Sequence, residues 1–159
     1  MKTLSVIGLL SMMTLSSSIK VRDMDIRWTD QGDRWLFELS APTEGWVAVG
    51  FNQKNNIVHT NLIMGAVSKG KVKAEDFHVV GFGNPQPITK LGGKFAINQV
   101  EGEEKLGRTT ICFSIPKKAI DKYHYDLKPG EDLWLICAYS RADEFDHHSM
   151  MRQHVKVKL

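Results

Sequence analysis

The segment of residues 45–66, GWVAVGFNQKNNIVHTNLIMGA, constrains the fold more than any other part of the chain. An apolar run from Trp46 to Phe51 ends at the polar residues 52–56, and a second apolar run begins at Leu62. Short runs of β-branched and aromatic residues that are bounded by turn-forming residues are typical of β-strands. The segment therefore predicts a strand, a loop and a second strand.

Similar short runs recur along the chain, and most of them are separated by Gly, Pro, Asn or Asp clusters. They cover residues 19–29, 34–41, 62–67, 72–83, 88–91, 95–100, 108–115, 133–140 and 151–159. One helical candidate, PKKAIDKYHY at residues 116–125, begins with a proline that suits a first helical turn. Nine or ten strands and one short helical turn predict an all-β, antiparallel, immunoglobulin-like β-sandwich, with the first three strands as a meander.

The first 18 residues differ in character from the rest. MKTLSVIGLLSMMTLSSS has a charged start, an apolar stretch too short to span a bilayer with ease, and small residues at its end. These are the features of a signal peptide. We expect residues 1–18 to be removed on export, leaving one domain at residues 19–159 that is secreted or periplasmic, with no stable membrane insertion.

Composition excludes several classes of function. The net charge of +3 is small and the lysines are scattered, which argues against binding to nucleic acid. The chain has no GxSxG elbow, HExxH motif, glycine-rich phosphate loop or CxxC pair, so we do not expect an enzyme.

The two cysteines, Cys112 and Cys137, both fall within expected strands. Strand alternation places Cys112 with Thr110 and Ser114, and Cys137 with Leu133 and Leu135. The two side chains would then point into different layers. We expect two free thiols, with a disulfide as the alternative that export would allow.

The segment 143–154, DEFDHHSMMRQH, carries most of the candidate ligands. Counting back from the last expected strand places His148, Arg152 and His154 on its polar face. Imidazoles bind iron, copper and zinc. The alternative is that the histidines are solvated and that Arg152 pairs with Asp143 or Asp146.

Two motifs, taken together, resemble a known family. GWVAVGF followed by a loop and an apolar strand, and the C-terminal run LWLICAYSRADEFDHHSMMRQHVKVKL, resemble the corresponding parts of DOMON domains. The resemblance implies an extracellular β-sandwich that binds haem or sugars. It also implies a pocket between the loop at residues 52–61 and the loop at residues 141–149.

The resemblance further implies where haem iron would be held in the haem-binding members. The family's histidine falls on His148, with His147 one residue away, and its methionine falls near Ile57, which cannot ligate a metal. His59 in the same loop and Met64 in the next strand are the possible replacements. The parity that Met64 shares with Leu62 favours core packing.

Three ligands remain open, and a further alternative is a structural or partner-binding sandwich with no small ligand. The first is haem b with an electron-transfer role and a redox partner protein. The second is a sugar, bound by a haem-free carbohydrate module that uses Trp46 or Phe51 as a stacking surface. The third is a divalent metal held by the histidines His147, His148 and either His59 or His154.

The remaining histidines, His78 and His124, lack a partner at ligand spacing and are interpreted as structural, with His124 in a surface cap.

Overall fold

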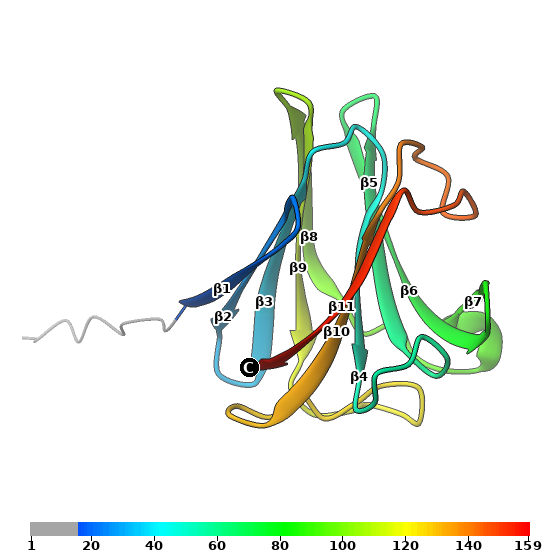
Figure 1. The fold of residues 1–159 in the computed structure, drawn as a ribbon. Coiled ribbons are helices and arrows are strands. Elements are labelled where there is room, and N and C mark those ends of the chain that lie inside the picture. Colours follow the sequence, from blue (N-terminus) through cyan, green and yellow to red (C-terminus); the bar gives the residue numbers. More distant parts are fainter. Residues whose placement is uncertain (1–15) are drawn as a thin grey trace, which may run out of the picture.

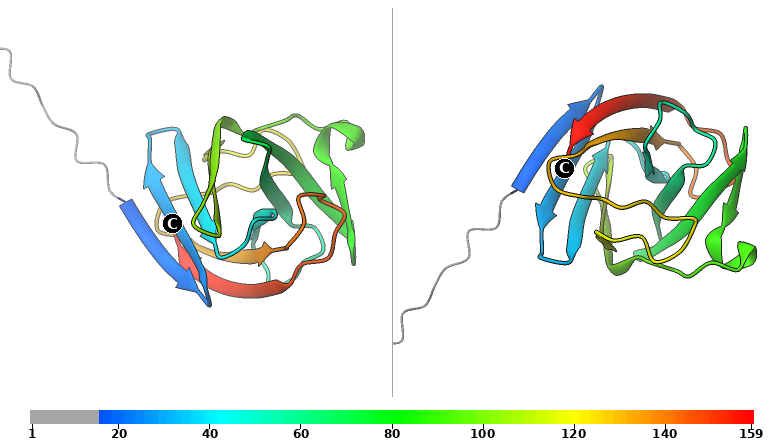
Figure 2. Two further views of the ribbon diagram at one scale, coloured as in Figure 1. Left: turned by 90° about the horizontal axis from the view of Figure 1, so that it is seen from above. Right: turned by 90° about the horizontal axis from the view of Figure 1, so that it is seen from below.

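The computed structural model describes residues 16–159, in which two antiparallel sheets pack face to face (Figure 1). The five-stranded sheet has the order β1 (Ser16–Val21), β2 (Met24–Asp30), β3 (Arg34–Ala41), β9 (Arg108–Pro116), β8 (Asn98–Lys105). The six-stranded sheet has the order β11 (Met151–Lys158), β10 (Asp132–Tyr139), β4 (Val47–Asn52), β5 (Asn61–Ser68), β6 (Lys71–Gly81), β7 (Asn84–Pro87). The predicted all-β sandwich is confirmed. The views along the sandwich show the two layers and place β1 beside β11 (Figure 2), where Arg22 donates to Gln153 across 3.3 Å.

Most of the predicted signal peptide lies outside the described residues. Its last three residues, 16–18, lie in β1 and pair with residues 27–29 of β2. Removal of residues 1–18 would therefore leave Ile19, Lys20 and Val21 of this edge strand.

Two predictions about the first strands are wrong. The run 19–29 is two strands, since the chain reverses at Arg22, whose φ of 54° is in the left-handed region. The expected meander ends at β3, because β3 pairs with β9 and the next strand, β4, belongs to the other sheet.

The short helical element is also elsewhere. Pro116 ends β9, residues 117–125 form bends and turns, and the amide of Lys117 donates to the carbonyl of Asp33 in the β2–β3 turn, 2.9 Å away. A 3-10 turn, η1 (Ile88–Leu91), forms where a strand was expected, and it ends at Gly92 with φ 83°. Long-range backbone bonds thus override the local helix pattern of the 116–125 segment.

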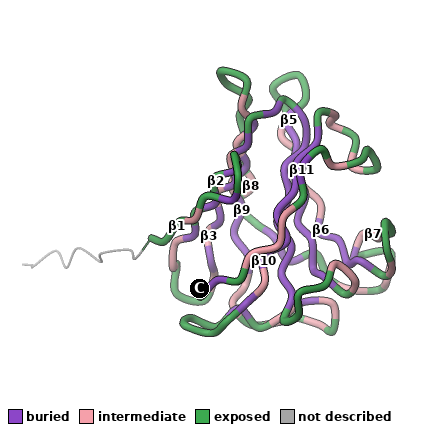
Figure 3. Tube along the Cα trace, in the orientation of Figure 1, coloured by how far each residue is buried: buried purple, intermediate pink, exposed green. Residues whose placement is uncertain are grey.

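Aromatic side chains from both sheets meet in the core between them. The ring of Phe37 stacks on Phe113 with centroids 5.7 Å apart and meets Phe51 edge-on at 5.1 Å. All three side chains have no exposed surface. The burial map shows the central strands as the most buried part of the molecule and several hairpin tips as exposed (Figure 3). Because burying one such side chain contributes roughly 1.5–3 kcal/mol, this triad is a major part of the core.

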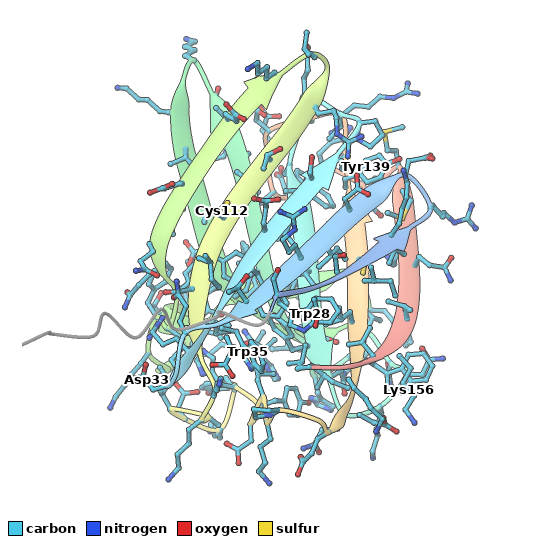
Figure 4. The ribbon with its side chains drawn as sticks, turned by 90° about the vertical axis from the view of Figure 1, so that its left-hand side faces the viewer. Trp28, Asp33, Trp35, Cys112, Tyr139 and Lys156 are labelled. Atoms are coloured by element: carbon cyan, nitrogen blue, oxygen red, sulfur yellow. The ribbon has the colours of Figure 1, made fainter. Side chains whose placement is uncertain are left out.

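The two cysteines face different layers, as strand alternation predicted. Cys112 lies on the outward face of the five-stranded sheet (Figure 4), and its sulfur is 3.9 Å from a carboxylate oxygen of Glu38. Cys137 is buried between the sheets, and both thiols are free. Burial raises the pKa of Cys137 to about 12, and burial together with the charge of Glu38 raises the pKa of Cys112 to about 11. Both are protonated at neutral pH.

A buried carboxylate–imidazole–carboxylate triad ties β6 to the segment before β10. His124 donates from Nδ1 to Asp121 (2.6 Å) and from Nε2 to Asp76 (3.0 Å). Asp76 is fully buried and also accepts from the side chain of Asn61 (2.7 Å) and the amide of Ala96 (3.0 Å). His124 is therefore a buried tie between segments and not part of a surface cap.

The triad also fixes the protonation of His124. Burial alone lowers the pKa of His124, but the hydrogen bonds and charges of Asp76 and Asp121 outweigh burial and raise it above its usual range. With both ring nitrogens donating to carboxylates, the imidazole is charged.

We expect His124→Gln to lower the free energy of unfolding by about 3 kcal/mol, because it leaves two carboxylates without their buried cation. The stabilisation by His124 is fully present below its unfolded pKa of about 6.5 and is lost as pH rises through the raised folded-state value. Urea unfolding from pH 6 to 9 should show this decline in the parent chain and not in the variant. The control, His147→Gln at an exposed position, should stay within about 0.5 kcal/mol of the parent. Equal stability of His124→Gln and the parent would contradict the account.

Candidate functional site

The central strands of the six-stranded sheet are covered on both faces. Every residue of β4 is buried, as are the first seven of β5. Inward side chains such as Val49 and Ile63 join the core between the sheets. Outward side chains such as Ala48, Leu62 and Met64 form a second apolar cluster with residues of β6 and β10. The unbroken apolar run in the sequence therefore reflects a covering layer on the outside of this sheet.

That covering layer comes from the chain before β11. The loop 141–150 starts where the backbone around Ser140 lies so close to Gly45 that an added Cβ would be 2.5 Å from the Ser140 carbonyl. The amide of Trp46 donates to the carbonyl of Ala142 (2.9 Å), and Ser140 Oγ donates to the carbonyl of His148 (2.8 Å). These bonds hold both ends of the loop beside β4.

An aromatic contact fastens the middle of the loop to the sheet. The ring of Phe145 meets Phe77 of β6 edge-on with centroids 5.9 Å apart, and the ammonium of Lys73 lies 4.7 Å from the Phe145 centroid. The apolar area buried between the two rings and the cation–π contact with Lys73 both stabilise Phe145 in this position. The two histidines that follow Phe145 are thereby held over the outward face of the sheet.

A cavity of about 500 Å³ lies between the sheet and its cover. Its floor consists mainly of apolar side chains from β4, β5, β6 and β10. Its other walls come from β7, η1, the loop 141–150 and the start of β11. The floor and wall residues include Trp46, Ala48, Ile57, Leu62, Met64, Phe77, Val79, Asn84, Gln86, Lys90, Ile136, Ala138, Phe145, His147, His148 and Arg152. This size and mixture fit a small-molecule site.

The cavity brings together four of the predicted site residues. Trp46 lies in the floor, and His147, His148 and Arg152 lie in the cover and at the start of β11. Both histidines are exposed. The guanidinium of Arg152 donates to Ser149 Oγ across 3.3 Å, and the salt bridges within residues 16–159 do not include one between Arg152 and Asp143 or Asp146.

Three other predicted positions do not reach the cavity. Phe51 belongs to the core between the sheets, so its predicted role as a stacking surface is wrong. His59 lies in the β4–β5 loop with its ring beside His78, and His154 of β11 bonds Asn55 Oδ1 across 2.7 Å. Burial, followed by the charge of Arg152, lowers the pKa of His154, which favours its neutral form.

The predicted three-histidine metal centre does not form. Within residues 16–159, no three or more His, Cys, Asp or Glu side chains lie close enough together to hold one ion. His59 and His154 lie outside the cavity that His147 and His148 line, because the β4–β5 loop carries His59 toward β6 instead.

Ile57 and Met64, the two positions considered for a methionine ligand, both line the cavity. Ile57 lines it, at the place where the resemblance expected methionine. Met64 lines it too, because Leu62 and Met64 face outward from β5 and pack in the second apolar cluster rather than in the core between the sheets. The thioether of Met64 is thus in the same cavity as the two imidazoles.

The sequence contains little that would identify several of the residues lining the cavity. Lys90 lies in η1, where a strand was expected, and Asn84 and Gln86 lie in the proline-containing β7. Phe145 could have been identified from the sequence, because it is a lone aromatic residue in an acidic loop. Trp46 adds one further feature: its Nε1 is buried and has no hydrogen-bond partner among the described residues, a cost of about 1–3 kcal/mol.

No helix within residues 16–159 is long and apolar enough to cross a membrane.

Comparison with known proteins gives one family and several similar folds. A family model described as DOMON domain matches residues 21–140. "MOXD1 homolog 2" of Drosophila melanogaster is 26% identical over 121 residues, which is 76% of this chain but only 16% of that protein.

Two solved structures share the fold. The cytochrome domain of Myriococcum thermophilum cellobiose dehydrogenase aligns with a TM-score of 0.60 at 11% identity, over 92% of this chain and 82% of that one. The cytochrome b domain of Coprinopsis cinerea pyranose dehydrogenase aligns with a TM-score of 0.58 at 10% identity, over 90% and 80%.

We expect Phe145→Ala to loosen the loop 141–150, since the variant loses the contacts with Phe77 and Lys73. Cleavage after Glu144 by a glutamate-specific protease should be roughly fivefold to tenfold faster, which corresponds to about 1 to 1.4 kcal/mol in local opening. Phe82→Ala is the control, because Phe82 is 83% exposed. Equal cleavage of Phe145→Ala and the parent would contradict this anchoring role.

Proposed function

Because this chain belongs to the DOMON domain family, we propose that its outer cavity binds haem b and that the protein is an exported electron-transfer module without catalytic activity of its own. The proposal assigns Met64 and His148 as the iron ligands, with His147 as the alternative to His148. The observation that carries it is the presence of a thioether and imidazoles in one apolar cavity of about 500 Å³.

The chemistry of the donor set fits this group. Thioether sulfur and imidazole nitrogen are both established axial ligands of haem iron. The floor side chains Ala48, Leu62 and Ala138 are buried and apolar, as the face of a porphyrin requires. Lys90 and Arg152 place two cations on the lining, where carboxylates of a ligand would meet opposite charge.

Bound haem would supply a one-electron couple to the protein. The chain's own residues would bind it, set the polarity of its surroundings and exclude water through the cover. An electron carrier also needs a redox partner protein, and the fold similarity to the cytochrome domains of two dehydrogenases supports a partner of that kind.

A sugar is the second candidate ligand, and two observations favour it. Ile57, near the position to which the resemblance assigns the family's methionine, lines the cavity and cannot ligate iron. The ring of Trp46 lies in the floor, and Asn84 and Gln86 add amide groups to the lining. Aromatic rings and amides together are suited to the apolar faces and hydroxyls of a sugar.

The haem proposal is tested by titrating the purified protein with hemin and recording absorbance spectra in both oxidation states. We expect a sharp Soret band and resolved α and β bands on reduction. His148→Ala and Met64→Leu should each weaken hemin binding at least tenfold, about 1.4 kcal/mol, or change the spin state.

Two substitutions serve as matched controls. Met150→Leu alters an exposed methionine of the same loop, and His154→Ala alters a histidine outside the cavity. Both should leave the spectrum unchanged. A broad spectrum like that of free hemin in the parent chain would refute haem binding, and a shift of tryptophan fluorescence on adding oligosaccharides would then support the sugar.

Export is tested separately by expressing the full chain and determining the N-terminus of the mature protein. We expect processing near Ser18, because the apolar run and the three serines precede it. Recovery of the chain with Met1 still present from the secretory pathway would contradict this.

A further inference from the structure

A pair of histidines outside the cavity, His59 and His78, has a geometry that none of the roles described so far accounts for. Their ring centroids are 5.9 Å apart and their planes are inclined by 40°. Neither residue lines the cavity. The pair lies where the β4–β5 loop crosses the end of β6, next to the segment that contains Tyr123 and Tyr125.

The hydrogen bond that His78 makes fixes its tautomer. Its Nδ1 is 3.3 Å from the carbonyl oxygen of Tyr123, which can only accept, so Nδ1 carries the proton. Nε2 then carries a free lone pair, and the one hydrogen bond that the His78 ring makes within residues 16–159 is the bond from Nδ1. An imidazole whose Nδ1–H donates to a backbone carbonyl is oriented as metal-binding histidines commonly are.

The charge state of His78 also suits a ligand. Burial, partly offset by the bond to Tyr123, lowers its pKa, and the neighbouring His59 and His124 lower it further. The side chain is therefore neutral at pH 7. Only a neutral imidazole can donate a lone pair to a metal ion.

His59 is held in place through its backbone. Its φ of 68° lies in the left-handed region, which is uncommon for a residue other than glycine. Its amide donates to the carbonyl of Val79 (2.8 Å), and its carbonyl accepts from the hydroxyl of Tyr125 (2.9 Å). These bonds maintain a strained backbone that directs the exposed ring toward His78, and such strain is typical of functional positions.

We propose that His59 and His78 form a two-histidine site for a divalent transition-metal ion, with Cu²⁺ and Zn²⁺ as the chemical class that imidazole ligands favour. Two imidazoles that share an ion through nitrogens about 2.0–2.1 Å from it have ring centres roughly 5–6.4 Å apart. The observed centroid separation of 5.9 Å lies in that range, and the site requires the exposed ring of His59 to turn a nitrogen toward the ion.

Two protein ligands leave the other coordination positions to water or to an exogenous molecule. The site therefore differs from a closed structural zinc site, which has four protein ligands. It also differs from a calcium site, which needs six or more oxygen ligands. By the usual order of stabilities, Cu²⁺ should bind more tightly than Zn²⁺.

The test is a calorimetric titration of the full chain, carrying no polyhistidine tag and freed of metal by chelation, with Cu²⁺, Zn²⁺ and Ca²⁺. We expect one equivalent of Cu²⁺ and of Zn²⁺ to bind, and Ca²⁺ not to bind. His59→Asn should weaken both interactions at least tenfold. Asparagine tolerates the left-handed backbone, so this variant keeps the fold.

A control variant and a second readout keep the result specific. His154→Asn changes another histidine outside the cavity and should bind metal as the parent does. Zn²⁺ should shift the imidazole NMR signals of His59 and His78 together. Equal binding by His59→Asn and the parent, or shifts confined to His147 and His148, would overturn the proposal, and neither outcome depends on whether the cavity binds haem.

Discussion

The packing of both faces of β4 and β5 is the constraint on which the rest of the molecule depends. Inward residues complete the core with the five-stranded sheet, and outward residues need a second cover. Leaving several apolar side chains in water would cost roughly 25 cal/mol for each Å² exposed. The loop 141–150, β7 and η1 therefore serve as part of the hydrophobic structure as well as the wall of a cavity.

The class of fold was predictable because strand signals are local. Apolar runs such as 46–51, bounded by turn residues, identify strands without knowledge of their partners. The pairing of residues 34–41 in β3 with residues 109–116 in β9 was not predictable from such signals. The 3-10 turn at η1 was missed for a related reason, since Ile88 is fully buried and its apolar character resembles that of a strand.

The candidate site was partly predictable for a different reason. His148 and Trp46 were found because they lie in the two motifs with a recognisable order and spacing. The face of Met64 could not be assigned, because alternation gives the relative parity of Leu62 and Met64 but not which layer they face. His59 does not line the cavity, because its loop folds back onto β6, next to a histidine 19 positions along the chain.

Because the cavity lies outside the sandwich, selection for ligand binding and selection for a stable core act on different residues. In a barrel that holds its ligand in the interior, a change in the binding residues also changes the core. Here the interior aromatics Phe37, Phe51 and Phe113 do not line the cavity, and its polar walls lie on β7, η1, the loop 141–150 and the start of β11. Ligand preference can therefore drift in evolution, or be varied in a combinatorial library, at positions such as 84, 86, 90 and 147 while the sandwich itself stays intact.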